Sequence, residues 1–190
     1  MRGCSMASTI TFKRFVEIMR IQGVPVYANW SLVVVWGLIL LAAFLRAVDW
    51  LAAFAAYSLL LLLHECGHMV AARRKGCRVT SIELYPIHGF TRFEQPWSRY
   101  DHSVIAWGGV LAQAVVAAPL VAWAEIFGRT RWPFADMVID ILGYYSVLLA
   151  MFNLLPVPPL DGATAWYFFP EFLKRLRKPA VKRRVSWRGW

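Results

Sequence analysis

Charged side chains are scarce in this sequence of 190 residues, and acidic ones most of all. Asp, Glu, Lys and Arg make up 17% of the chain, with 11 acidic residues against 21 basic ones. Hydrophobic residues account for 59%, and the mean hydropathy is +0.48, whereas an ordinary soluble domain is about 45–50% apolar. This composition excludes an ordinary soluble domain and favours a chain that crosses a membrane several times.

Cysteine is also rare, and no long linker, internal repeat or low-complexity segment divides the chain. The three cysteines, Cys4, Cys66 and Cys77, are odd in number and widely spaced, so they predict no disulfide framework. A cleaved secretory signal is not expected, because charges are scattered through the first 25 residues and the following apolar run is too long for one.

The apolar residues gather in four stretches, each close to the about 20 residues that a bilayer crossing needs. The stretches lie at roughly 27–48, 50–72, 103–127 and 134–155. Of the Lys and Arg residues, 18 lie in the N-terminal segment, between the second and third stretches, or in the tail, and 3 lie in the other two connections. The positive-inside rule therefore predicts that both termini are cytoplasmic.

These spans predict a single membrane-embedded domain over residues 1–190. We expect a cytoplasmic segment at 1–26, the spans and core at 27–173, and a basic cytoplasmic tail at 174–190. The net charge of +10 is then an orientation signal and an attraction to anionic membrane lipids. No nucleic-acid partner is expected, since no basic face interleaved with aromatic residues accompanies the charge.

The second apolar stretch carries the motif His64-Glu65-Cys66-Gly67-His68 after a run of uncharged residues. A helix turns by about 100° and rises by about 1.5 Å per residue, so the two histidines lie on one face, about one turn apart. Glu65 is close enough to reach a metal-bound water without being a ligand itself. Because ionisable groups inside a bilayer are costly, the motif predicts a functional metal site and not a structural polar cluster.

A third ligand is needed, because catalytic zinc usually has three protein ligands and an open position. The best candidate is Asp161, at the end of the segment Asn153-Leu-Leu-Pro-Val-Pro-Pro-Leu-Asp161-Gly162. Three prolines within four residues prevent a helix, and broken backbone at membrane depth is tolerated only where protein or a water-filled cavity surrounds it. Gly162 lets the chain turn tightly behind the carboxylate. Asp136 and Asp140, near the outer end of the fourth stretch, are weaker candidates, as is Glu125 in the third.

Together the two motifs resemble those of the site-2 protease family of intramembrane zinc metalloproteases. HECGH lies within an apolar stretch, and NLLPVPPLDG follows about ninety residues later. Three further segments resemble family features: 23–31 the start of the first span, 82–90 a membrane-dipping β-hairpin, and 107–113 a small-residue motif of the third span. The resemblance covers most of the chain.

The resemblance implies that His64, His68 and Asp161 bind one Zn²⁺ per chain and that Glu65 is the general base. It also implies substrate-binding roles, which fall on Asn153, Gln113 and Gly89. The chain departs from the family's usual residues at three positions, Asn29, His88 and Gln113, none of which is a ligand or the base. The PDZ and CBS domains of many relatives are not expected.

The implied fold is an all-α membrane protein with about four transmembrane helices, a short membrane-associated β-hairpin and a proline-broken segment near the active site. Residues 79–94 are the expected hairpin, with a turn at 86–89 and a strand edge to which an unwound substrate can add; the alternative is a plain amphipathic connector. Residues 163–173 are apolar but too short to span a bilayer, so they predict a short helix packed on the core or lying at the inner interface.

The expected function is that of an intramembrane metalloendopeptidase, which hydrolyses peptide bonds within or next to transmembrane segments with a zinc-activated water. Its partners are transmembrane protein or peptide substrates and membrane lipids, and its location is a prokaryotic plasma membrane, as a multi-pass protein. The alternative is a non-catalytic membrane metal-binding or transport protein, or an inactive relative that binds helices. Glu65 favours the enzyme, because neither alternative needs a base beside two ligands. The oligomeric state stays open.

Overall fold

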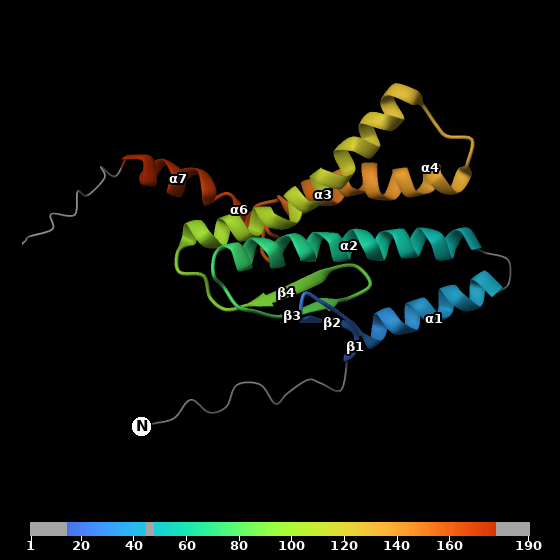
Figure 1. Ribbon diagram of the computed structural model, residues 1–190, viewed down its shortest axis with the longest axis horizontal. Helices are drawn as coiled ribbons and strands as arrows, with labels where there is room; N and C mark the ends of the chain where they lie inside the picture. Colours follow the sequence, from blue (N-terminus) through green and yellow to red (C-terminus); the bar gives the residue numbers. More distant parts are fainter. Residues whose placement is uncertain (1–14, 45–47, 178–190) are drawn as a thin grey trace, which may run out of the picture.

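The computed structural model describes residues 15–44 and 48–177 of the chain, and it stacks long helices on one face of a small β-sheet (Figure 1). Of the expected cytoplasmic segments at 1–26 and 174–190, residues 1–14 and 178–190 lie outside the described residues. In chain order the elements are β1 (Phe15–Ile21), β2 (Val24–Asn29), α1 (Trp30–Phe44), α2 (Val48–Arg74), β3 (Val79–Leu84), β4 (Gly89–Phe93), α3 (Arg99–Phe127), α4 (Pro133–Ile139), the π-helix η2 (Asp140–Tyr145), α5 (Ser146–Asn153), α6 (Gly162–Ala165) and α7 (Phe168–Arg177).

The sheet has four strands in the order β1-β2-β3-β4. The pairs β1–β2 and β3–β4 are antiparallel, and β2 pairs with β3 in parallel through Val26 opposite Ile82 and Ala28 opposite Leu84. The expected hairpin at 79–94 is therefore present as β3 and β4. The expectation of an all-α protein with only this hairpin was incomplete, because two earlier strands, β1 and β2, belong to the same sheet.

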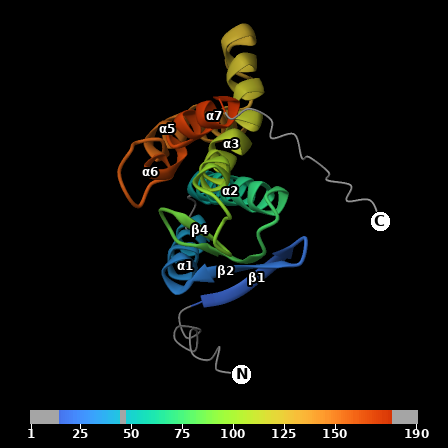
Figure 2. The ribbon, with the colours of Figure 1, turned by 90° about the vertical axis from the view of Figure 1, so that its left-hand side faces the viewer.

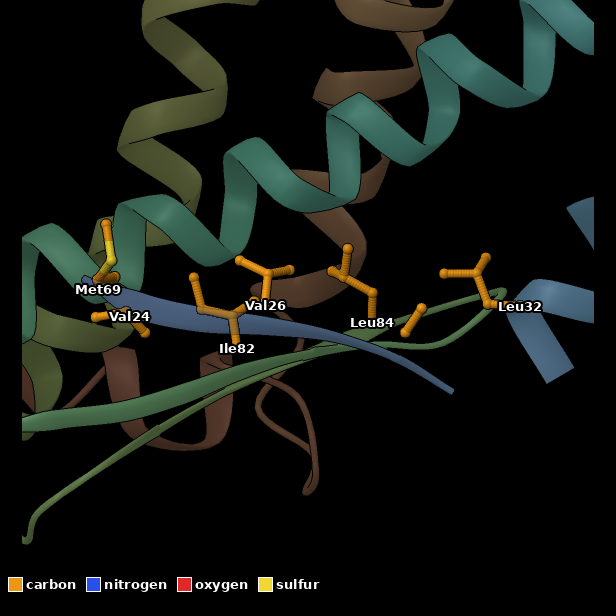
Figure 3. Close-up of a cluster of buried hydrophobic side chains, with 7 residues drawn as sticks. Val24, Val26, Leu32, Met69, Ile82 and Leu84 are labelled. Atoms are coloured by element: carbon orange, nitrogen blue, oxygen red, sulfur yellow. The ribbon is translucent and has the colours of Figure 1, made fainter. Parts of the chain in front are cut away.

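A cluster of buried aliphatic side chains fixes the sheet against α2. Val24 and Val26 of β2 lie beside Ile82 and Leu84 of β3, and all four point to the same side of the sheet (Figure 3). Met69 of α2 covers them, and Leu32 of α1 closes the far end. Alternate residues of a strand face one side, so this face places the sheet directly beside the turns of α2 that carry the ionisable motif.

Helix α3 packs on the opposite side of α2 from the sheet, as the two perpendicular views show (Figures 1 and 2). Two glycines allow a very close crossing. A Cβ at Gly67 of α2 would lie 2.7 Å from the Ala112 side chain and would collide with the Gly108 carbonyl, and a Cβ at Gly108 would lie 2.6 Å from the Gly67 carbonyl oxygen. The middle turns of α2 are therefore held between the sheet and α3.

Among the described residues, three helices are long and apolar enough to cross a membrane: Leu51–Arg74, Arg99–Phe127 and Pro133–Asn153. They correspond to the second, third and fourth apolar stretches, and the third span is continuous through α4, η2 and α5. The first expected span, 27–48, is not matched at full length. Residues 27–29 belong to β2, and α1 has 15 residues, short of the about 20 needed. The count of four crossings is thus not confirmed.

The proline-rich segment between α5 and α6 breaks the helix as expected, and it folds back on the core. The Trp166 indole donates to the Leu154 carbonyl at 2.7 Å, and the Trp107 indole of α3 donates to the Ala165 carbonyl at 3.0 Å. Gly162 is required by close approach, because a Cβ there would collide with the Leu154 carbonyl. Helix α7 then packs Phe168 on Tyr100 of α3 with ring centroids 5.5 Å apart.

Candidate metal centre

Two histidines of α2 point their Nε2 atoms toward the same point, because hydrogen bonds at their Nδ1 atoms orient both rings. His64 Nδ1 lies 3.0 Å from Gln113 Oε1, and His68 Nδ1 lies 2.8 Å from the Ile105 carbonyl oxygen, both on α3. With oxygen acceptors there, each ring donates through Nδ1–H and turns Nε2 away from α3. The two Nε2 atoms are 3.0 Å apart, and both side chains are buried.

Asp161 brings a carboxylate to the same spot from the other side. Its Oδ2 lies 3.0 Å from His64 Nε2 and 3.1 Å from His68 Nε2. Asp161 precedes α6 directly, but its side chain makes no capping hydrogen bond to that helix and is free to face the histidines.

The three atoms form a group that can hold a metal ion, with all of them within 4.8 Å of one another. Two imidazole nitrogens that donate through Nδ1 and one carboxylate oxygen present lone pairs to a common point, and only a cation relieves their mutual repulsion. Ligand atoms about 2.0–2.1 Å from a tetrahedral zinc lie about 3.3 Å apart, close to the observed 3.0–3.1 Å. Gly109 leaves room, because a Cβ there would lie 2.6 Å from His68 Nε2.

Glu65 lies next to this group but is not part of it. Its side chain points to β4, where the Thr91 hydroxyl donates to Glu65 Oε2 at 2.7 Å. Gly89, two residues earlier on β4, abuts the same carboxylate, since a Cβ at Gly89 would lie 2.6 Å from Glu65 Oε1. Glu65 is buried, at 4% exposure, and is held by the sheet and not by the ligands.

A cavity of about 500 Å³ joins the metal-capable group and the Glu65 carboxylate. His64, Glu65, His68 and Asp161 line its floor together with Asn153. The remaining walls are mainly apolar. They come from α2 and α3, from the hairpin, and from α5 and the proline-rich segment, and they include Tyr57, Ile87, Phe90, Leu149, Phe152 and Leu160. Apolar walls with a few convergent polar groups are the usual lining of a ligand site.

The structure brings most of the site residues expected from the sequence close to the metal-capable group, but not all of them line the cavity. Asn153 lines the cavity, with Nδ2 3.5 Å from His64 Nε2, and Gly89 lines it beside Glu65. Gln113 does not line the cavity; it is 1% exposed and contacts His64 from behind. Asp140 pairs with Arg129 at 3.4 Å, away from the group.

Sequence reasoning missed several supporting groups: the Thr91 hydroxyl, the Ile105 carbonyl and the space at Gly109. Gly109 lies in the small-residue motif 107–113, so a signal for close packing was present. Nothing in the sequence pointed to Thr91 or Ile105, because their contacts depend on how β4 and α3 pack on α2.

Fold and site describe a protein with three membrane-length helices and a largely buried His-His-Asp group that can hold a metal ion, with a carboxylate beside it. Comparison with known families agrees, because residues 52–128 match the model of Peptidase family M50. The matched residues include the HECGH motif and end before Asp161. Residues 52–128 therefore form a Peptidase family M50 domain, the domain of the site-2 proteases.

Relatives are similar over most of this chain. Rip3 of Mycobacterium tuberculosis, which its name describes as a zinc metalloprotease, is 32% identical over 77% of this chain and 41% of its own length. The protein sll0528 of Synechocystis, named in the same way, is 29% identical over 77% of this chain and 42% of its own length. The chain thus spans about two fifths of the length of these curated relatives.

A solved structure shares the fold. The site-2 protease from Methanocaldococcus jannaschii superimposes with a TM-score of 0.65 and 20% sequence identity, over 85% of this chain and 72% of that one. The chain therefore has the site-2 protease fold.

Proposed function

We propose that this chain is an intramembrane zinc metalloendopeptidase that hydrolyses peptide bonds within or next to transmembrane segments. The observation that carries the proposal is the convergence of His64 Nε2, His68 Nε2 and Asp161 Oδ2, 3.0–3.1 Å apart, on the floor of an apolar-walled cavity. The zinc metalloproteases among its relatives support the same metal and the same chemistry.

His64, His68 and Asp161 would hold one Zn²⁺. When bound, the ion supplies a Lewis acid that polarises the scissile carbonyl and makes water more acidic. The chain's own residues fix the ligand set, because Gln113 and Ile105 accept from the two Nδ1–H groups and so keep both Nε2 atoms available.

Glu65 is the general base of the proposed reaction. It lines the same cavity as the three ligands but belongs to no ligand group, as a base requires. The carboxylate accepts a proton from the attacking water and returns it to the leaving amine. A transport protein or an inactive helix-binding relative would have no use for this carboxylate.

The substrate must be extended for attack, and β4 offers a partner for it. Among the described residues β4 pairs with β3 alone, so its other edge is free, and Gly89 of β4 lies against Glu65. A transmembrane segment that unwinds beside this edge can add to the sheet as a further strand. Its peptide bonds would then lie along the cavity next to the base.

The proposed location is a prokaryotic plasma membrane, with both termini in the cytoplasm. The charge asymmetry of 18 basic residues against 3 supports this orientation. A reporter fused after Trp190 should be active in the cytoplasm; activity confined to the outside would contradict the orientation.

Cleavage of a transmembrane peptide by the purified chain in detergent tests the proposed activity. Wild-type protein should cleave, should stop when a zinc chelator is added, and should recover with zinc. Glu65→Gln should keep one zinc per chain and lose cleavage by about 100-fold or more. Glu125→Gln is the matched control, since Glu125 bonds Tyr144 far along α3, and it should cleave normally. Cleavage by Glu65→Gln at the wild-type rate would overturn the mechanism.

A further inference from the structure

The carboxylate of Glu65 is anchored by a single side chain. Among residues 15–44 and 48–177, the hydroxyl of Thr91 makes the one hydrogen bond that this carboxylate receives, at 2.7 Å to Oε2. The same hydroxyl lies 3.0 Å from the Glu65 backbone carbonyl. A long, flexible glutamate side chain in an otherwise apolar wall would have several rotamers without such an anchor.

Strand β4 contacts Glu65 at two positions that face the same way. Residues two apart in a strand project to one side of the sheet, so Gly89 and Thr91 both face α2. Gly89 leaves the space that Oε1 occupies, since a Cβ there would lie 2.6 Å from that atom, and Thr91 binds Oε2. One oxygen is thus confined by shape and the other by a hydrogen bond.

We propose that Thr91 is a positioning residue, which holds the Glu65 carboxylate toward the metal centre and thereby lets β4 set the geometry of the base. The inference rests on the proposed function, because it assigns Thr91 a role in the reaction of Glu65. Thr91 touches neither of the histidines nor Asp161 through any hydrogen bond of the described structure. Its effect should therefore fall on the chemical step and not on metal binding.

The placement of Thr91 on β4 couples the base to the free strand edge. β4 is the strand to which an extended substrate would add, and its backbone carries the residue that orients Glu65. A substrate strand that pairs with β4 would lie beside the residue that orients the base. This coupling explains why an edge strand, which proteins usually protect from pairing, lies directly beside the catalytic carboxylate.

Two substitutions separate the hydroxyl from the rest of the side chain. Thr91→Val keeps the size and the branching but loses the hydroxyl; it should lower kcat about 10- to 100-fold, the scale expected when a catalytic group is misplaced. KM for a transmembrane peptide and the zinc content should stay at wild-type values. Thr91→Ser keeps the hydroxyl and should restore kcat close to wild type.

Thr80→Val is the matched control, because Thr80 on β3 donates its hydroxyl to the Arg92 carbonyl at 3.1 Å on the exposed side of the same hairpin. It should cleave normally. Three results would each overturn the inference. They are a wild-type kcat in Thr91→Val, equal losses of kcat in Thr91→Val and Thr91→Ser, and a loss of kcat that parallels a loss of bound zinc. If wild type cleaves and Glu65→Gln does not in the same assay, the proposed function stands whatever the result for Thr91.

Discussion

The two walls of the metal centre are built in opposite ways. The spans Leu51–Arg74 and Arg99–Phe127 carry and support the histidines. In an apolar stretch of 18 residues within each span, 44% and 39% are buried in the protein. In Pro133–Asn153, which leads to Asp161, only 11% is buried. The site therefore takes two ligands from a closely packed wall, and the third follows a helix that is much more exposed.

The difference has a direct physical cause. The α2–α3 crossing is close because Gly67 and Gly108 face each other across it, and interiors packed this closely transmit strain and tolerate little change in volume. The wall that bears Asp161 is attached near the site by a few polar contacts, such as the Trp166 indole on the Leu154 carbonyl. Substitutions of the glycines at the crossing in the first wall should affect folding, and those in the second wall should affect the metal and the substrate.

The largest effect is expected from filling the helix crossing. Gly67→Val puts a branched side chain against the Gly108 backbone, where neither helix can yield without separating. Overpacking of this kind typically costs about 1–3 kcal/mol, and backbone on the opposing side puts this position at the upper end. Gly37→Val, in α1, is the control, because a Cβ at Gly37 meets nothing within 4 Å. Thermal unfolding midpoints in detergent compare the two, and equal midpoints would contradict the picture of a rigid wall.

Removal of the third ligand should be next in size. Asp161→Ala leaves two histidines and should weaken zinc binding by more than the about 10- to 100-fold that loss of a mere supporting partner costs, while the fold stays intact. Asp140→Ala removes an acid from the same wall that pairs with Arg129 and should keep zinc. Metal analysis of both purified variants decides the matter. Full zinc in Asp161→Ala would remove Asp161 from the site.

A smaller and more selective contrast is expected between the two amide side chains. Gln113→Leu deprives His64 Nδ1 of its acceptor and should weaken zinc binding about 10- to 100-fold. Asn153→Leu changes a residue that lines the cavity and should alter kcat or KM with zinc retained. Zinc titration and cleavage kinetics on both variants test this division. The reverse pattern would mean that Gln113, as expected from the family resemblance, acts on the substrate.

What could be read from the sequence was mostly local. The motif His64-Glu65-Cys66-Gly67-His68 places both histidines on one helix face by periodicity alone, and the prolines before Asp161 predict a break at the right place. The partners of these residues could not be predicted, because Thr91 and Gln113 reach the site only through the packing of β4 and α3 on α2.

The sheet shows the same limit. The hairpin at 79–94 has a local pattern and was predicted, whereas β1 and β2 join it through a parallel pairing of Val26 with Ile82 that spans all of α1 and α2. Residues 27–29 precede a long apolar run, so the sequence predicts that they begin a span, but in the structure this pairing places them in β2. Apolar composition alone does not distinguish a buried strand from the end of a buried helix.

In the proposed metal centre one zinc ion is held across both walls by two imidazoles and a carboxylate. X-ray absorption at the zinc edge of the purified chain tests it most directly. The predicted spectrum has only nitrogen and oxygen neighbours at about 2.0–2.2 Å, with imidazole scattering, at one zinc per chain. A sulfur neighbour at about 2.3 Å, which would implicate Cys66, or a chain that binds no zinc at all, would contradict it.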